Sequence, residues 1–315
     1  MNSNTNTHKI LIVGAGSKTA QALVRLIKAE TPWEIVLVSS TVKEYRQNNG
    51  MSYYPLDYSQ PKELKNIFLK ELPTVVINTA AMTNVDKCET EHKAAWEANV
   101  TLVEYIARMC KITDAHLIHF STDYIFDGAK GLYSETDIPN PISYYGKTKL
   151  ASENSCKVST VPHTIIRTNV VYGFSIYNTK DFVEWVLTNL EAGEPFTVVT
   201  DQISNPTFTD DIALAIIKII KKKREGTYNI GGADWLSRFD FAKVIASVFH
   251  FDEELIKPIL TESLNQKAKR PLKGGLLTLK AQTDLQMNFA TVKAGLSTLR
   301  HHKLMDAMEK ERFGV

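Results

Sequence analysis

Four short apolar runs, each followed by small or polar residues, constrain the fold more than any other feature of the sequence. They are Lys9–Val13, Glu34–Val38, Thr74–Asn78 and His116–Phe120. Between them, apolar residues recur at three- and four-residue spacing, which indicates amphipathic helices. Strands that alternate with helices predict an α/β fold built on a parallel, doubly wound sheet. Ligands bind at the carboxyl ends of the strands in such a sheet, so the residues after each run are candidates for a site.

The first run ends at a glycine turn, Gly14-Ala15-Gly16-Ser17, and a helix pattern follows. This unit is typical of a Rossmann-like fold, in which backbone N–H groups and the helix N-terminus face a pyrophosphate. The pattern is incomplete, because Thr19 replaces the third glycine of G-x-G-x-x-G. Under the spacing G-x-x-G-x-x-G, Ser17 and Ala20 replace two glycines, and the Cβ of Ser17 lies where a phosphate must approach. A plain turn is the alternative. The candidate cofactor residues of this turn are Gly14, Gly16, Ser17 and Lys18.

The residues after the second run bear on the choice of cofactor. An acidic residue there would hold the ribose 2′-hydroxyl of NAD. Ser39 and Ser40 follow instead, with Lys43 and Arg46 further on. Hydroxyl and cationic groups suit a 2′-phosphate, so we favour NADP over NAD, with a solvated loop as the alternative. The remaining predicted cofactor contacts are Asp57 and the small residues Ala80 and Ala81, against which a nicotinamide ribose can lie.

The stretch Ser121 to Lys149 brings together three groups that can handle one proton. Thr122 follows the fourth run after Ser121. Tyr145 and Lys149 are four residues apart, which places both on one face of a helix. An unperturbed tyrosine titrates near ~10, and we expect the charge of Lys149 to lower the pKa of Tyr145 so that it serves as a general acid. Thr122 is expected to bind the same substrate oxygen. A surface Tyr–Lys pair is the alternative. Asn99 is a candidate for relaying protons through water.

Several longer stretches resemble the extended short-chain dehydrogenase/reductase superfamily and, within it, the dTDP-4-dehydrorhamnose reductases. They are Asn78–Glu89, Ser121–Gly128, Arg167–Gly173, Val199–Thr207, and Arg270-Pro271 with Leu276. The resemblance implies NAD(P)H-dependent reduction of a nucleotide-linked 4-keto-6-deoxy sugar, catalysed by Thr122, Tyr145 and Lys149. It also implies substrate contacts from five residues, with Val170 where the family usually has a tryptophan. These are Thr83, Asp86, Asp123, Val170 and Arg270.

Two rival functions share this resemblance. Nucleotide-sugar dehydratases and epimerases use the same fold, but the dehydratases place Asp-Glu directly after the threonine. Here Asp123 is followed by Tyr124, which fits a simple reduction better. The β subunit of methionine adenosyltransferase keeps the fold as a regulatory partner. The altered glycine turn favours that rival, and the intact Thr122, Tyr145 and Lys149 oppose it.

Composition and charge bear on the partners, metal sites and location that we expect for the protein. The net charge of +2 over 315 residues gives no reason to expect nucleic acid as a partner. The three cysteines suggest neither a disulfide framework nor a zinc site, and we expect no metal site, since His116 and His119 fall on opposite faces of a strand. The longest apolar run is too short to span a membrane. We therefore expect a cytoplasmic protein, and leave a homodimer open.

The regular alternation of strands and helices ends after Gly173. We predict a dinucleotide-binding domain over residues 1–172 with 203–224. A smaller α/β substrate-binding lobe is expected over residues 173–202 with 225–315. A helix predicted over Thr179–Leu190 opens this lobe, and another begins after Ser237.

Overall fold

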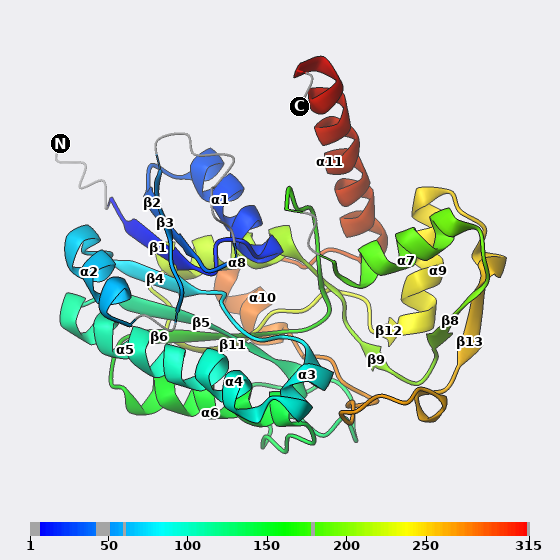
Figure 1. Ribbon diagram of the computed structural model, residues 1–315, viewed down its shortest axis with the longest axis horizontal. Coiled ribbons are helices and arrows are strands. Elements are labelled where there is room, and N and C mark those ends of the chain that lie inside the picture. Colours follow the sequence, from blue (N-terminus) through cyan, green and yellow to red (C-terminus); the bar gives the residue numbers. More distant parts are fainter. Residues whose placement is uncertain (1–6, 42–50, 59–60, 178–179, 314–315) are drawn as a thin grey trace.

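The computed structural model describes residues 7–41, 51–58, 61–177 and 180–313. Among these residues, seven strands form one central sheet in the order β3-β2-β1-β4-β5-β6-β11, and every neighbouring pair is parallel (Figure 1). The predicted doubly wound α/β fold is thus confirmed. The strands are β1 (Lys9–Val13), β2 (Glu34–Ser39), β3 (Ser52–Pro55), β4 (Val75–Asn78), β5 (His116–Thr122), β6 (His163–Thr168) and β11 (Gly226–Asn229).

Helices cover both faces of the sheet, which explains why its strands are apolar without interruption. Alternate residues of β1 point to opposite faces, so Ile10 and Ile12 enter one core while Leu11 and Val13 enter the other. The first core packs under α1 (Lys18–Glu30), α8 (Thr209–Lys221) and α10 (Leu279–Leu285). The second packs under α2 (Pro61–Glu71), α5 (Leu102–Thr113) and α6 (Tyr144–Val158).

The helix that leads to β5 contains an irregular turn. After α3 (Val85–Thr90), α4 (His92–Trp96) runs directly into a π-helical turn at Glu97–Thr101 and then into α5. A π-turn inserts one extra residue into the helical repeat and is frequent at functional sites. Here it buries the side chain of Asn99 completely.

A smaller lobe lies beside the sheet, on the right of Figure 1. Its helices share one apolar core, which includes Phe241 and Ile245. These helices are α7 (Phe182–Ala192), α9 (Arg238–Phe249) and α11 (Val292–Phe313). Outside the central sheet, the described strands pair as β8 (Phe196–Val199) with β13 (Ile256–Ile259), β9 (Ile203–Ser204) with β12 (Leu236–Ser237), and β7 (Val171–Tyr172) with β10 (Thr207–Phe208). Short 3₁₀ turns lie at Asp123–Ile125, Glu253–Leu255 and Thr261–Ser263.

Two predicted boundaries need correction. The substrate lobe does not take in all residues from 225 on, because β11 pairs with β6 in the central sheet and α10 packs against α8 and β11. Their side chains Tyr228 and Leu285 belong to the same core as α1. The rest of the domain division stays a prediction. The helix expected from Thr179 begins at Phe182, where Asp181 accepts from the backbone N of Glu184 at 2.9 Å; Thr179 lies outside the described residues.

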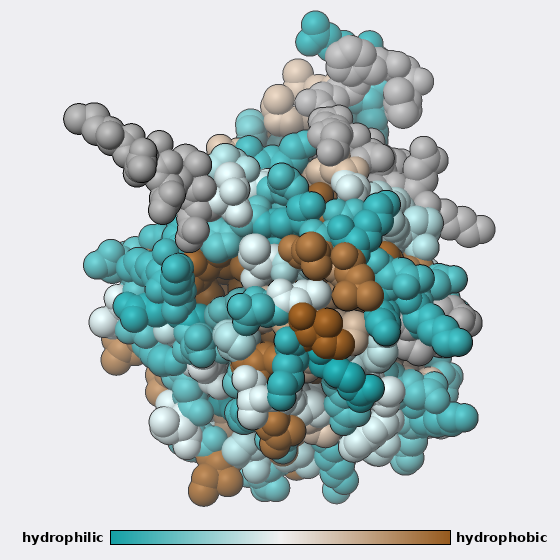
Figure 2. Space-filling model, turned by 90° about the vertical axis from the view of Figure 1, so that its left-hand side faces the viewer, coloured by the Kyte–Doolittle hydropathy of each residue, from teal (hydrophilic) through white to brown (hydrophobic). Residues whose placement is uncertain are grey.

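Figure 2 shows one side of the molecule as mostly hydrophilic, with hydrophobic side chains gathered near its middle. Within the described part of the chain, no helix combines the length and the apolar character needed to cross a membrane.

Candidate active site

The strand order reverses between β1 and β4, and the crevice at such a reversal is where doubly wound sheets bind ligands. Gly14 lies at this point, directly after β1. It adopts a φ of +93°, and a Cβ there would come within 2.6 Å of the Ala80 backbone N and the Thr79 Oγ1. Glycine is therefore required both by the left-handed backbone and by the close approach of the turn to the end of β4.

Two cavities open along this edge, with volumes of about 450 and 430 Å³. They adjoin, because Ser17, Thr79, Ala81 and Thr83 line both. The smaller cavity is also lined by residues of the glycine turn and of the β2 and β4 ends, namely Gly14, Gly16, Ser40, Thr41 and Ala80. The larger is lined by Lys18 and by the three predicted catalytic residues, Thr122, Tyr145 and Lys149. Together the cavities form an elongated site with the predicted cofactor turn at one end and the predicted proton donors at the other.

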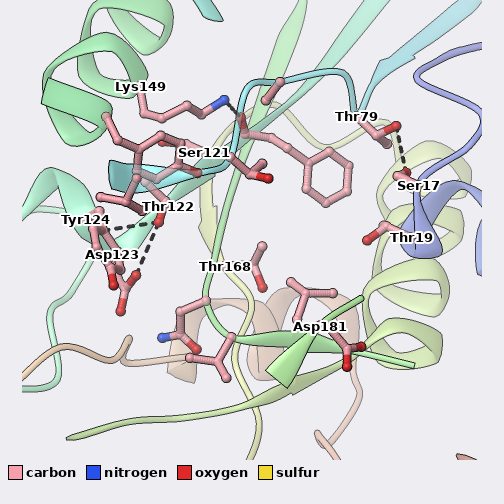
Figure 3. A pocket seen from close by; sticks show the side chains of 18 of the residues that line it. Ser17, Thr19, Thr79, Ser121, Thr122, Asp123, Tyr124, Lys149, Thr168 and Asp181 are labelled. Carbon is pink, nitrogen blue, oxygen red and sulfur yellow. Dashed lines mark hydrogen bonds between the residues drawn. The ribbon is translucent and has the colours of Figure 1, made fainter. Parts of the chain in front are cut away.

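Ser17 replaces a glycine of the expected turn, and the structure gives its hydroxyl a role within the protein. Its Oγ is the N-cap of α1, accepting from the Ala20 backbone N at 3.1 Å, and it donates to Thr79 Oγ1 at 3.0 Å (Figure 3). The side chain thus ties the start of α1 to the end of β4. An open cavity at the N-terminus of a 13-residue helix, beside a glycine with no room for a Cβ, fits a dinucleotide phosphate.

The residues at the end of β2 that line the cavity are not the ones we predicted. Ser39 is 1% exposed, and Asp57 is exposed to solvent, but neither is among the described residues that line the two cavities. Ser40 and Thr41 line the smaller cavity in their place. Successive side chains of β2 alternate between the two covered faces of the sheet, and Ser39 falls on the same face as Leu37, inside the core under α1. Lys43 and Arg46 lie outside the described residues.

The three predicted proton-handling groups converge because α6 packs closely on the turn after β5. Ser143 caps α6, accepting from the Gly146 backbone N at 3.2 Å, and Tyr145 and Lys149 follow on one helix face. A Cβ on Gly146 would overlap the carbonyl oxygen of Tyr124. Glycine at this position lets α6 approach the turn that begins at Thr122, and the Thr122 hydroxyl hydrogen-bonds Tyr145.

The electrostatics of this group differ from the prediction. Burial, followed by the neighbouring Tyr124 and Asp123, raises the pKa of Tyr145, and the bond from Thr122 only partly opposes this. The nearby Lys149, whose Nζ donates to the Phe120 carbonyl at 2.5 Å (Figure 3), does not bring the pKa of Tyr145 below its ordinary value. Burial lowers the pKa of Lys149 to about 8, against the opposing effects of Cys156 and Glu153. Tyr145 therefore carries its proton at neutral pH, as a proton donor must.

The predicted substrate residues fall into two groups. Thr83, Asp123 and Val170 line the larger cavity. Asp123 is buried, which raises the pKa of its carboxyl group, and it accepts from Thr122 Oγ1 at 3.2 Å and from the Gly275 backbone N at 3.1 Å. Val170 has a φ of +40°, a strained value for a β-branched residue, of the kind that clusters at functional sites.

The structure does not bring Asp86 and Arg270 to the larger cavity. Instead they pair with each other, the Arg270 Nη2 donating to Asp86 Oδ2 at 2.7 Å, and the Nη1 donates to the Ala268 carbonyl at 3.1 Å. Arg270 lines a separate hollow with Asp127 and Asp201. Asp86 thus neutralises the charge of Arg270, although both residues were expected to bind substrate.

Several residues behind the site hold its parts in place. Asn99 accepts from the Met82 backbone N at 2.7 Å and donates to the Met82 carbonyl and to Thr148 Oγ1, so its amide is engaged in fixing the loop after β4 rather than in the predicted proton relay. His119 Nε2 lies 2.9 Å from Ser152 Oγ, which donates to the Lys149 carbonyl at 2.7 Å. This chain of contacts orients the turn of α6 that carries Lys149.

Two further cavity residues escaped the sequence analysis. Asp181 binds Lys18 Nζ at 2.6 Å, across from the Thr122 side of the cavity in Figure 3. Arg238, the first residue of α9, lines the larger cavity together with Asp123 and Tyr124. The only local signal for Arg238 is the Ser237 N-cap, which fixes where α9 begins and hence where this side chain projects.

Comparisons with known proteins agree with this geometry. A family model described as the RmlD substrate binding domain matches residues 8–304. The spore coat polysaccharide biosynthesis protein SpsK of Bacillus subtilis is 31% identical over 265 residues, which cover 84% of this chain and 87% of that protein. The dTDP-4-dehydrorhamnose reductase of Aggregatibacter actinomycetemcomitans is 31% identical over 286 residues, covering 87% and 92%. A solved structure of dTDP-4-dehydrorhamnose reductase from Bacillus anthracis in complex with NADP matches with a TM-score of 0.84 at 26% identity, over 94% of this chain and 99% of that one. This chain therefore belongs to the RmlD substrate binding domain family.

Proposed function

We propose that this chain is an NAD(P)H-dependent reductase of a nucleotide-linked 4-keto-6-deoxy sugar, of the dTDP-4-dehydrorhamnose reductase type. The observation that carries the proposal is the convergence of Thr122, Tyr145 and Lys149 on one cavity that adjoins the Gly14 turn. Relatives that bear the name of this reductase match most of the chain. Dehydratases carry a glutamate after the aspartate, whereas Tyr124 follows Asp123 here. This supports reduction over dehydration, since reduction of a ketone needs only one protonation.

The chemistry divides between the cofactor and the chain. The reduced nicotinamide supplies a hydride to the ketone carbon. Tyr145 gives its proton to the ketone oxygen, and its raised pKa keeps that proton in place until charge develops on the oxygen. Thr122 donates a hydrogen bond to the same oxygen and fixes its position. Lys149, buried next to this pair, supplies the positive charge that stabilises the phenolate left on Tyr145.

The cofactor in this proposal is NADP or NAD, with NADP favoured. The solved structure from Bacillus anthracis holds NADP, and the β2 end of the smaller cavity presents the hydroxyl residues Ser40 and Thr41. Such groups suit a 2′-phosphate better than an acidic residue does. Gly14, Gly16, Ser17, Ala80 and Ala81 are the proposed cofactor contacts along the cavities.

A two-step experiment tests the proposal. Nicotinamide fluorescence is followed while the protein is titrated with NADPH and then NADH, and a dTDP-4-keto-6-deoxy sugar is added. We expect binding, followed by oxidation of the cofactor. Tyr145→Phe should bind cofactor normally but turn over about a hundredfold more slowly or worse, since general-acid catalysis contributes on this order. Absence of binding by both cofactors refutes the enzyme, whereas undiminished turnover by Tyr145→Phe refutes only the role of Tyr145.

The proposal also bears on the partners of the enzyme. Its partner is a nucleotide-sugar, and we infer no role for nucleic acid or membrane. A cytoplasmic location and a homodimer stay predictions from the sequence, to be checked by fractionation and by light scattering.

A further inference from the structure

The positive side chains that line the larger cavity differ in what they contact. Lys18 is paired with Asp181 at 2.6 Å, and Lys149 donates to the Phe120 carbonyl. Lys180 is exposed to solvent, where water hydrates its charge. Arg238 is partly buried, and no described carboxylate forms a salt bridge with it, although the buried Asp123 acts on its charge electrostatically. Among the described cavity residues it is thus the partly buried cation whose charged group is neither ion-paired nor bonded to a carbonyl.

The Arg238 side chain is held in a defined place. Its backbone N donates to the Gln202 carbonyl at 2.9 Å, and its guanidinium lies over the Phe182 ring at 4.8 Å from the ring centre. A guanidinium that stacks on an aromatic ring keeps its N–H groups free at the edge. Burial lowers the pKa of Arg238, with Tyr124 and Asp123 opposing the effect, yet an arginine stays charged in any protein. A partly buried guanidinium that forms no salt bridge is stabilised by a ligand that brings an anion to its N–H groups.

We propose that Arg238 binds the diphosphate of the nucleotide-sugar and so places the sugar for reduction. The inference rests on the proposed function for the identity of the ligand. In a nucleotide-linked 4-keto sugar, the diphosphate is attached at the ring carbon opposite the ketone. If Tyr145 and Thr122 bind the ketone oxygen, the diphosphate lies one sugar ring away, on another wall of the same cavity. Arg238 lies on that cavity, and its planar fork of N–H donors matches phosphate oxygens in pairs.

Arg270 is the competing candidate, because the sequence resemblance assigned it to the substrate. Its guanidinium already donates to Asp86 at 2.7 Å and to the Ala268 carbonyl at 3.1 Å, and it lines a different hollow. Recruiting it to a phosphate requires breaking its charge-assisted bond to Asp86, which would keep only backbone donors such as the Ala268 N at 2.9 Å. Arg238 requires no such exchange.

Two variants and a control test the assignment. Arg238→Gln removes the charge, and Arg238→Lys keeps the charge but loses the paired geometry. Lys243→Gln, on the same helix, removes an exposed charge whose side chain is 40% exposed, and is the matched control. Calorimetry measures the binding of dTDP, thymidine and NADPH to each protein, independently of turnover. Steady-state assays measure KM and kcat with the dTDP-4-keto-6-deoxy sugar.

We expect Arg238→Gln to weaken dTDP binding and raise the sugar-nucleotide KM by about ten- to a hundredfold, as for loss of a hydrogen-bonded charge. Arg238→Lys should fall between it and the wild type, and Lys243→Gln should match the wild type. Thymidine and NADPH binding should not change. Unchanged dTDP affinity in Arg238→Gln, equal losses for thymidine and dTDP, or a wild type that binds no dTDP overturns the inference. A wild type that binds dTDP through Arg238 but oxidises no NADPH refutes the proposed reaction and leaves the inference standing.

Discussion

The buried ammonium of Lys149 makes a contribution to stability that depends on pH. Its side chain is 2% exposed, and burial lowers its pKa from 10.5 to about 8. Between these values Lys149 is protonated in the unfolded chain and neutral in the folded chain, so its contribution to the free energy of unfolding rises with pH from about 8 to about 10.5. At about 1.36 kcal/mol per pKa unit, the rise amounts to about 3 kcal/mol. Below the folded-state pKa both states are protonated, and the full cost of burying the charge remains.

Lys149→Met isolates this effect, because it keeps the length of the side chain and removes the charge. It also removes the bond to the Phe120 carbonyl, worth about 1 kcal/mol. Near neutral pH the variant should therefore be more stable than the wild type by about 2 kcal/mol. Above the unfolded-state pKa, where Lys149 is neutral in both the folded and the unfolded wild type, the variant should be less stable by about 1 kcal/mol. Urea unfolding of both proteins across the window gives the difference, in which the titration of all other groups cancels. A difference that stays flat with pH would show that the ammonium is not desolvated.

Three other predictions concern the same region. Gly146→Ala forces a Cβ against the Tyr124 carbonyl, so α6 must shift, and kcat should fall about a hundredfold while NADPH affinity by fluorescence is retained. Arg167→Met leaves the fully buried Glu153 carboxylate without its 2.8 Å partner and should lower the free energy of unfolding by about 3–5 kcal/mol in urea; a loss below 1 kcal/mol contradicts this reading of the pair. In stopped-flow assays, kcat/KM for reduction should fall as pH rises through about 8, where Lys149 loses its charge in the free protein; a level profile excludes Lys149 as the controlling group.

The parts of the fold that the sequence predicted are those encoded over short distances. The β1 strand and its turn are marked by a continuous apolar run that stops at Gly14, and both were confirmed. The convergence of Tyr145 and Lys149 follows from helical spacing, and Thr122 joins them because parallel strands end at a common edge. None of these inferences required knowledge of which elements pack together.

The failures arise where distant segments decide the outcome. The strand β11 has the same local appearance as a lobe strand, and only its pairing with β6 places it in the central sheet. The short edge strand β3 ends at Pro55 and has little buried surface, so no periodic pattern marks it. The predicted lowering of the Tyr145 pKa was wrong, because spacing on α6 cannot show how completely the folded chain buries Tyr145, and burial is the main cause of its raised pKa.

Charges show most directly why a motif alone does not assign a site. Asp86 and Arg270 both belong to stretches that resemble the family, yet they are 184 residues apart and neutralise each other. Lys18 stands in the cofactor turn, yet Asp181, from the lobe, binds its ammonium. Because an ion pair satisfies both partners, each such pair removes two candidates from ligand binding. What a ligand meets is the charge that no partner within the protein pairs, and among the described cavity residues Arg238 carries such a charge although no motif contains it.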